Sequence, residues 1–325
     1  MKRISTCSLH AGLAIATLMA ATAPVLAQDA VQKVKVAYLR TLGIVHIWQA
    51  EKMGAFKKEG IEVEQITLNN GPAVASAIAS GSAAIGFAAA TPMITAISQS
   101  QPFKVFMTNN TEKHPSQWVE SIVVAEASPA KSVADLKGKT IIINAVGAAC
   151  ELQLRGNLLL AGLKYEDVKT VILPFPQHAA AMERGDGDAS CNVEPFLSFM
   201  KLGKLKTRAI TDGMVAGIDK LGEVVIDGNF ARGDWLAKNP KAAAAFKRAL
   251  EAADAHMLKN VPDYRAWLTG DFKLPPDVAN AITPLINTGK LDAKPEQWQP
   301  VIDSMHKTGM IAQHIKAEDI IFKLP

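Results

Sequence analysis

The chain has few of the residues that build most catalytic and metal centres. Only three of its 325 residues are cysteines and only seven are histidines. His46, His114 and His178 fall in a predicted helix, a loop and a helix start, without the paired spacing of a zinc site. The sequence also has no Gly-x-Ser-x-Gly motif and no phosphate-binding loop. These absences argue against an enzyme, a metal site and a resident cofactor.

A basic surface stripe is also missing. The 35 lysines and arginines nearly balance the 31 aspartates and glutamates, and the two kinds are interspersed along the chain. Lys57 and Lys58, for example, stand beside Glu59. Without a cluster of basic residues and interleaved aromatics, nucleic acid is a poor partner.

Long hydrophobic runs are confined to the N-terminus. Lys2 and Arg3 precede an apolar run over Leu9–Ala23, and Val25–Ala27 has the small-x-small ending of a cleavage site. We expect residues 1–27 to be a signal peptide, because the run is too short for a lasting membrane helix. Cleavage leaves 325 − 27 = 298 residues, and the net charge falls from +4 to +2. Cys7 precedes the run, which disfavours a lipid anchor, so the mature protein should be soluble and exported.

Two cysteines, Cys150 and Cys191, remain after cleavage. An oxidising compartment permits a disulfide between them. The alternative is a pair of buried free thiols, which behave as small hydrophobic residues. We favour the free thiols.

Strands and helices alternate through the first two thirds of the mature chain. Apolar runs and period-two alternation predict strands at Val34–Tyr38, Ile61–Leu68, Ala84–Ala88, Val105–Thr108, Glu120–Ala125, Thr140–Asn144, Val168–Leu173, Ala189–Val193 and Glu223–Phe230. From Asp234 on, the sequence is nearly all helical, with prolines such as Pro300 as punctuation. This order predicts an α/β protein with mostly parallel sheets.

The pattern of elements starts twice, which predicts two lobes. In both Ala79–Gly86 and Glu183–Ser190, a helix stops at a glycine and a strand of small residues begins. We assign residues 28–121 and 223–325 to lobe I, with the C-terminal helices packed on it, and residues 122–222 to lobe II. Two strand-like crossings then form a hinge, and a groove faces the carboxyl ends of both sheets.

One stretch suggests how a ligand is held. The strand Thr140–Asn144 runs into the small residues Gly147, Ala148 and Ala149, and a helix follows. Backbone N–H groups at a helix start are unpaired and attract anions. The stretch therefore predicts a socket for an anionic or strongly polar group. The alternative is an ordinary strand-to-helix turn that binds nothing.

Loops past the other strand ends supply further candidates, because ligands of open α/β sheets bind there. The candidate ligand-binding residues are Tyr38, Arg40, Thr41, Asn70, Gly71, Thr91, Trp118, Asn144, Gly147, Ala148, Ala149, Gln177, His178, Asn192 and Glu194. Several have a plainer alternative: a surface salt bridge for Arg40, a helix cap for Thr91 and a turn position for Asn70.

Three candidates bear on the kind of ligand. Glu194 either accepts from a ligand nitrogen or forms a salt bridge between the lobes. Trp118 either stacks on a ligand ring or packs in the core. His178 either bonds a ligand or caps a helix. A carboxylate near a helix start favours a zwitterion, or a heterocycle with N–H groups, over a bare oxyanion.

Three motifs resemble those of the periplasmic solute-binding proteins of the nitrate, taurine and alkanesulfonate type. Ala50–Val63 is similar to the family pattern A-x-x-x-G-x-F-x-x-x-G-[LI]-x-V, and Ser132–Lys139 to S-x-x-D-L-K-G-K. Gly185–Ala189 with Glu194–Phe196 resembles G-x-x-D-A…[DE]-P-[FYW]. The chain departs from the family at Asn192, where an apolar tryptophan is usual. It also departs in the first lobe, at Ala84–Gly86, where members often carry an aspartate.

The resemblance implies a two-lobed periplasmic-binding-protein fold of type II. Its members close on a small solute in the periplasm and deliver it to an ABC transporter permease in the inner membrane. The solute would be polar, anionic or zwitterionic, as sulfonates, taurine and nitrate are, and the protein a monomer. The alternatives are a pyrimidine or aromatic heterocycle as ligand, a pyrimidine-forming enzyme on the same scaffold, and a membrane sensor as partner.

Overall fold

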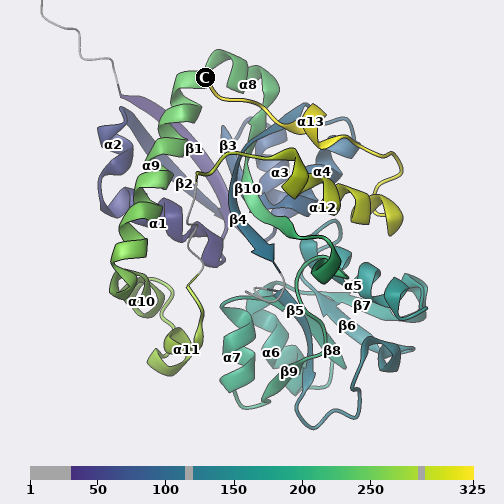
Figure 1. Cartoon of the computed structure of the whole chain (residues 1–325). Coiled ribbons are helices and arrows are strands. Elements are labelled where there is room, and N and C mark those ends of the chain that lie inside the picture. The colour runs from purple at the N-terminus through teal and green to yellow at the C-terminus, as the bar shows by residue number, and fades with distance from the viewer. Residues whose placement is uncertain (1–30, 114–119, 285–289) are drawn as a thin grey trace, which may run out of the picture. The chain divides into compact units, whose positions relative to one another are not determined.

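The computed structural model describes residues 31–113, 120–284 and 290–325. The predicted signal peptide, His114 and Trp118 lie outside the described residues. Two five-stranded sheets organise the rest (Figure 1). The sheet of lobe I has the order β2-β1-β3-β10-β4, from β1 (Gln32–Leu39), β2 (Ile61–Leu68), β3 (Ile85–Ala89), β4 (Phe103–Lys113) and β10 (Glu223–Arg232). The sheet of lobe II has the order β7-β6-β8-β5-β9, from β5 (Glu120–Ala125), β6 (Thr140–Ile143), β7 (Lys169–Ile172), β8 (Ala189–Val193) and β9 (Thr207–Ala209).

Each sheet contains one antiparallel strand. In lobe I, β1 runs parallel to β2 and β3, and β10 is antiparallel to β3 and β4. In lobe II, β6 runs parallel to β7 and β8, and β5 is antiparallel to β8 and β9. The predicted α/β class with two mostly parallel sheets is confirmed. The predicted lobe boundaries stay a prediction; the change expected at residues 121/122 falls inside β5.

Helices flank both sheets. The helices of the first part of the chain are α1 (Val45–Lys52), α2 (Ala55–Lys58), α3 (Gly71–Ala79), α4 (Ala90–Ser98), α5 (Ala149–Leu160), α6 (Phe175–Glu183) and α7 (Phe196–Leu202). The C-terminal helices are α8 (Gly233–Lys238), α9 (Pro240–Lys259), α10 (Val261–Gly270), α11 (Pro276–Ala281), α12 (Pro295–Lys307) and α13 (Ala317–Ile320). Four single 3-10 turns are η1 (Leu42–Ile44), η2 (Val133–Leu136), η3 (Tyr165–Asp167) and η4 (Ile218–Lys220).

The C-terminal helices pack mainly on the sheet of lobe I. Helix α9 contacts α1 and α2, and α12 contacts β10 and α4. The buried rings of Trp267 and Trp298 belong to two large apolar clusters, one within lobe I and one that extends from lobe I to Ala149 and Leu152 of α5, as the packing role predicted for them requires. The indole of Trp298 also donates to Thr108 Oγ1 at 2.9 Å. Buried apolar clusters therefore lie between the C-terminal helices and the sheet of lobe I.

Some predictions about local structure were wrong. Pro300 lies inside α12 rather than at an element boundary. Thr91 does not cap its helix, because α4 begins at Ala90 and the side-chain oxygen of Thr91 has no partner. The short elements α7 and β9 were not predicted, since three to seven residues carry little periodic signal.

The expectation of free thiols was also wrong. Cys150 is the second residue of α5, Cys191 lies in the middle of β8, and their sulfurs form a disulfide. Both side chains are buried, as expected. The sequence could not show that the helix start and the strand lie side by side, with Cα atoms 5.6 Å apart.

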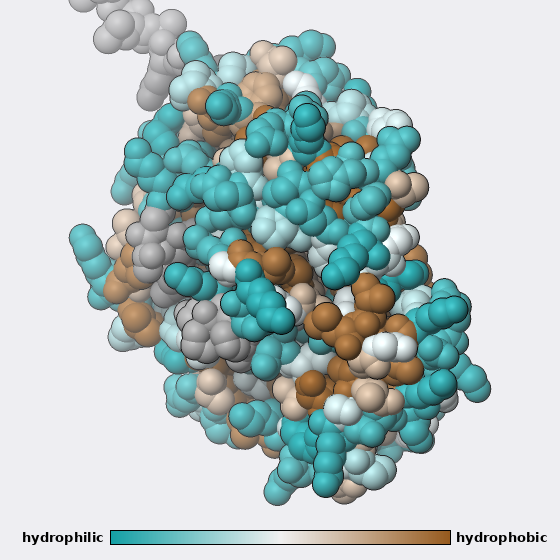
Figure 2. Space-filling model, turned by 45° about the vertical axis from the view of Figure 1, so that its right-hand side comes forward, coloured by the Kyte–Doolittle hydropathy of each residue, from teal (hydrophilic) through white to brown (hydrophobic). Residues whose placement is uncertain are grey.

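Among the described residues, no helix combines the length and apolar character needed to cross a bilayer. The face in Figure 2 is mostly hydrophilic, with hydrophobic residues gathered in patches near its middle.

Candidate functional site

A pocket with a cavity volume of about 70 Å³ lies between the two sheets. Its lining comes from the ends of β1, β2, β3, β6, β7 and β8 and the loops and helix starts that follow them, together with β5 and β10. The lining residues are Leu39, Thr41, Leu42, Gly43, Gly71, Phe87, Ala88, Ala89, Pro92, Glu120, Asn144, Ala148, Ala149, Phe175, Val193, Glu194, Ile226 and Asp227. None of these is a lysine or arginine. The pocket therefore combines apolar walls with a few polar groups, as small-molecule sites do.

The lobe II wall contains the start of α5. Ala148 precedes the helix in extended conformation and provides no side-chain cap. The Gly147 N–H donates to Glu151 Oε2 at 2.7 Å, so this amide is already satisfied. Among the described residues, the N–H groups of Ala148 and Ala149 donate no hydrogen bond to the backbone or to a side chain. These two amides are free to bind a negative group.

Asn144 stands beside this helix start at the end of β6. Its side chain is only 5% exposed, and its Oδ1 atom has no hydrogen-bond partner in the described part of the protein. A buried amide without a partner costs free energy until a ligand or water satisfies it. Asn144 is therefore prepared for a polar ligand.

Glu194 also lines the lobe II wall. Its carboxylate caps α7, accepting from the Ser198 N–H at 3.1 Å and the Ser198 hydroxyl at 2.8 Å. Burial raises the pKa of Glu194, and the bonds from Ser198 oppose this shift. The salt bridge between lobes that was considered for Glu194 is not found among the described residues.

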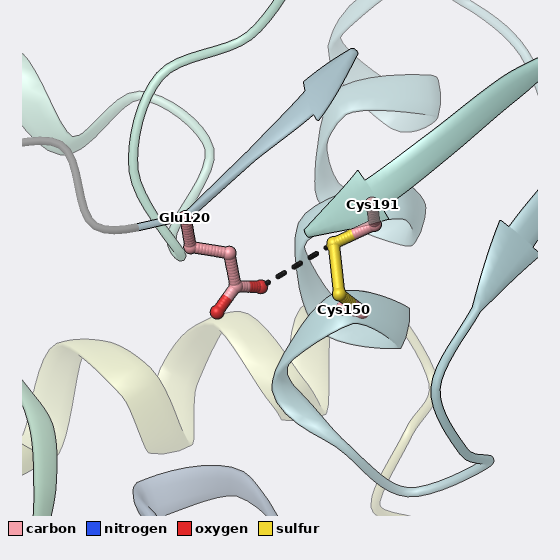
Figure 3. A group of neighbouring side chains, drawn as sticks. All are labelled: Glu120, Cys150 and Cys191. Carbon is pink, nitrogen blue, oxygen red and sulfur yellow. Dashed lines mark hydrogen bonds between the residues drawn. A yellow bond between two sulfur atoms is a disulfide. The ribbon is translucent and has the colours of Figure 1, made fainter. Parts of the chain in front are cut away.

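Glu120 enters the pocket from the start of β5. Its carboxyl points toward the disulfide, with Oε1 3.6 Å from Cys191 Sγ (Figure 3). Burial, followed by repulsion from Glu112, raises the pKa of Glu120 well above its ordinary value. A disulfide sulfur carries no hydrogen, so any hydrogen bond along this contact comes from the protonated carboxyl. Glu120, Cys150 and Cys191 are close enough to share a metal ion, but the disulfide removes both thiolate ligands.

Asp227 is the carboxyl of the lobe I wall. It lies on β10, is 6% exposed, and accepts from Asn110 Nδ2 at 2.9 and 3.1 Å. Burial raises its pKa to about 7, although the bonds from Asn110 and the charge of His46 oppose the shift. The pocket thus holds three carboxyl groups, and no lysine or arginine lines it to balance the charge of any that ionises.

Six of the predicted site residues line the pocket: Thr41, Gly71, Asn144, Ala148, Ala149 and Glu194. They come from both lobes and lie near strand ends, where the rule for open α/β sheets places a ligand. Their roles in binding stay predictions.

The remaining predicted residues of lobe I have other surroundings. The Tyr38 hydroxyl donates to Gln65 Oε1 at 3.0 Å. Arg40 donates to the Asp271 carbonyl and lies over the ring of Phe272, in a neighbouring groove. The Asn70 side chain caps α3 by accepting from the Ala73 N–H.

In lobe II, two predicted residues, His178 and Asn192, form hydrogen bonds within the lobe, and a third, Gln177, lies on the surface. His178 bonds Ser190 Oγ and the Leu173 carbonyl, each at 2.8 Å, and so links α6 to β8. Asn192 Nδ2 donates to the same Ser190 hydroxyl, while its Oδ1 has no partner. Gln177 is exposed on α6.

Sequence reasoning missed Glu120 and Asp227. Both are charged residues within otherwise apolar strands, ESIVVA and EVVIDGNF. A buried charge in such a strand needs a partner or a function, and this was the signal that could have identified them.

Comparison with known proteins adds relatives at the level of sequence and fold. The chain is 29% identical over 253 residues to the taurine-binding periplasmic protein of Escherichia coli K12, covering 78% of this chain and 74% of the relative. A putative aliphatic sulfonates-binding protein of the same organism is 38% identical over 84 residues, 26% of each chain.

Solved structures share the fold. The alkanesulfonate-binding protein SsuA of Xanthomonas axonopodis pv. citri superposes with a TM-score of 0.77 at 18% identity, covering 90% of this chain and 99% of that one. The nitrate-binding protein NrtA of Synechocystis PCC 6803 gives 0.70 at 16% identity, over 90% and 85% of the two chains. The family model described as NMT1/THI5 like matches residues 41–263, which is more than half of the sequence. The chain therefore belongs to the NMT1/THI5-like family.

Proposed function

We propose that the protein is the periplasmic solute-binding component of an ABC importer. It captures a small polar organic solute, anionic or zwitterionic, by closing its two lobes, and it carries out no chemistry. The observation that carries this proposal is the pocket, whose polar groups come from the strand ends of both lobes. A ligand that contacts both walls favours the closed arrangement, and this shape is what a permease can recognise.

The start of α5 receives the negative end of the solute. Two free amides, from Ala148 and Ala149, lie beside the unpaired carbonyl oxygen of Asn144. The two amides suit a sulfonate or carboxylate, whose oxygens accept from them, whereas the Asn144 oxygen is itself an acceptor and suits an N–H or O–H donor of the solute. The names of the relatives, which include taurine-binding and alkanesulfonate-binding proteins, support the same ligand chemistry.

Thermal unfolding with a panel of small solutes tests the proposal. The panel contains taurine, ethanesulfonate, longer alkanesulfonates and nitrate. A solute that binds only the folded protein stabilises it by about 2.7 kcal/mol at a hundred times its Kd. We expect saturable stabilisation by at least one member. A protein that responds to none of them at millimolar concentration would contradict the proposal.

Two variants of Ala149 distinguish the effect of losing the N–H group on binding from the effect of a larger side chain. Proline is well tolerated at the first position of a helix, which Ala149 occupies, and it removes the N–H group. Ala149→Val, the matched control, retains the N–H with a side chain of similar size. We expect Ala149→Pro to weaken binding of the anionic solute about tenfold more than Ala149→Val, the effect of one charge-assisted hydrogen bond. Equal affinities of the two variants would exclude this amide from the site.

A further inference from the structure

Asp227 stands at the end of a chain of buried polar groups. Asn110 Nδ2 donates to its carboxylate, and Asn110 Oδ1 lies 3.3 Å from His46 Nε2. On the other side of the ring, His46 Nδ1 contacts Asp254 Oδ1. The side chains come from β10, β4, α1 and α9, and none of the four residues is more than 6% exposed. A four-residue chain thus connects the core of lobe I to the pocket.

The direction of these bonds assigns charges along the chain. Because Asn110 uses its N–H₂ group on Asp227, its oxygen accepts from His46 Nε2, and His46 Nδ1 donates to Asp254. A histidine that donates from both nitrogens is positively charged. Burial opposes that charge, but Asp254 and then Asp227 outweigh it and raise the pKa of His46.

Asp254 directly neutralises His46, so the charge of Asp227 lacks a contacting cation. The other titratable groups at the pocket, Glu120 and Glu194, are also acids. A buried carboxylate in this position is costly, and a positive group in the pocket would remove that cost.

The Asp227 carboxyl is also fixed in place. A Cβ atom added to Gly43 would meet Asp227 Oδ2 at 2.7 Å and Phe87 Cζ at 2.4 Å, so the carboxyl and the ring pack directly on the glycine backbone. The two bonds from Asn110 hold the other side. The Asp227 carboxyl is therefore held in one orientation in a largely apolar wall. A fixed acceptor of this kind selects a ligand whose donor lies at one position.

We infer that Asp227 is the residue that receives a positively charged nitrogen of the solute, and that Asn110, His46 and Asp254 hold its carboxylate in position. The inference rests on the proposed function and narrows its ligand class. The solute carries an amino or amidinium-type nitrogen for lobe I together with an anionic group for lobe II. Amino sulfonates and amino acids without an α-substituent have this chemistry, whereas nitrate and simple alkanesulfonates lack the nitrogen cation.

Matched pairs of solutes test this directly: taurine against ethanesulfonate, and β-alanine against propionate. We expect calorimetric titration of the wild-type protein to show binding of an amine-bearing member at least tenfold tighter than that of its amine-free partner. Equal or tighter binding of the amine-free partner overturns the inference while leaving the proposed function intact. If the protein binds ethanesulfonate but neither taurine nor β-alanine, the inference is likewise overturned and the proposed function stands. Absence of binding by all members, and by the wider panel above, contradicts both.

Asp227→Asn keeps the size of the side chain and removes its charge. We expect it to reduce the affinity for the amine-bearing solute on the order of a hundredfold, with little change for the amine-free partner. Glu112→Gln is the matched control. Glu112 is also a buried acid, accepts from the Met214 N–H and does not line the pocket. Its variant should retain the preference for the amine. An Asp227→Asn variant that folds and keeps the wild-type preference overturns the inference.

Asp254→Asn tests the positioning chain. Without Asp254, His46 loses its main reason to remain charged, and Asp227 then loses the nearby positive group that favours its ionised form. The pH midpoint for binding of the amine should therefore move upward relative to the wild-type protein. A purely structural role for Asp254 would lower the thermal midpoint of unfolding and leave the pH midpoint of binding unchanged.

Discussion

The two walls of the pocket stand on sheets of the same plan but differ in chemistry, although both contain carboxyl groups: Glu120 and Glu194 in lobe II and Asp227 in lobe I. Lobe II presents free amides at the start of α5, and lobe I presents the Asp227 carboxyl on β10. Each wall is also held by its own internal device. A disulfide joins α5 to β8 in lobe II, while a buried chain of polar side chains supports Asp227 in lobe I. Two lobes of the same plan can therefore share the recognition of one solute, with lobe II binding its negative end and lobe I its positive end.

The largest expected effect comes from disrupting the buried chain of polar side chains that supports Asp227 in lobe I. His46→Leu leaves Asp254 buried without its partner, and removal of one member of a buried ion pair costs about 3–5 kcal/mol. Urea unfolding should show this loss of stability. The double variant His46→Leu with Asp254→Leu removes both charges and should recover part of it. A double variant less stable than His46→Leu would show that the pair acts through packing rather than charge.

The pH dependence of stability should come from buried acids of both lobes: Asp227 and Glu112 in lobe I and Glu120 in lobe II. Burial raises the pKa of Asp227 and that of Glu112 to about 7, from 3.8 and 4.5 in the ordinary case. Between those values the folded protein holds protons that the unfolded chain releases, so stability falls as pH rises. The raised pKa of His46 acts in the same direction, because its stabilising charge is lost as pH rises.

Asp227 and Glu112 together should contribute about 5 kcal/mol to the loss of stability of the ligand-free protein between pH 5 and pH 8. Urea unfolding at both pH values measures this difference. Asp227→Asn and Glu112→Gln should each remove about half of it. A wild-type protein that is equally stable at both pH values would contradict the assignment of these buried acids.

The device of lobe II responds to reductant instead. Cys150 and Cys191 are 41 residues apart, and the disulfide between them should contribute about 3 kcal/mol. The double variant with alanine at both positions should lose this amount in urea unfolding under oxidising conditions. Dithiothreitol should destabilise the wild-type protein and leave the double variant unaffected. A variant as stable as the oxidised wild-type protein would show that the pocket wall is held by packing alone.

The smallest expected effect concerns Glu194, the carboxyl of the pocket that is compared with Asp227. Glu194 already accepts two hydrogen bonds from Ser198, whereas Asp227 faces the pocket with a charge that lacks a contacting cation. Glu194→Gln should therefore lower the affinity for an amine-bearing solute only about threefold, well below the effect of Asp227→Asn. Calorimetric titration of both variants with the same solute makes the comparison. A larger loss at Glu194 would assign the nitrogen to lobe II.

Most of the fold could be predicted because local pattern and tertiary structure agree. Ile61–Leu68 and Glu120–Ala125 were predicted with the bounds that the structure has, since their alternation or apolar character suits one position in a sheet. The site was only partly predictable. The rule about strand ends identifies loops, and it found Asn144 and Glu194. It does not identify a side chain such as Asp227, which projects into the pocket from within a crossing strand.

Long-range partners were beyond reach for a physical reason. The contacts His46–Asp254 and Cys150–Cys191 join residues that are 208 and 41 positions apart, and no local periodicity encodes such pairs. Even the composition was misleading, because a buried cysteine looks the same in sequence whether or not it is oxidised.

The place of β10 in its sheet has a consequence for the order of assembly. It lies between β3 and β4, yet it is made only after the whole of lobe II. A nascent chain ending at residue 222 could pair every strand of the second sheet, but would leave the first one split into two unpaired edges. Lobe II should thus be the earlier folding unit, and the receptor for the cation the last part of the molecule to acquire its shape.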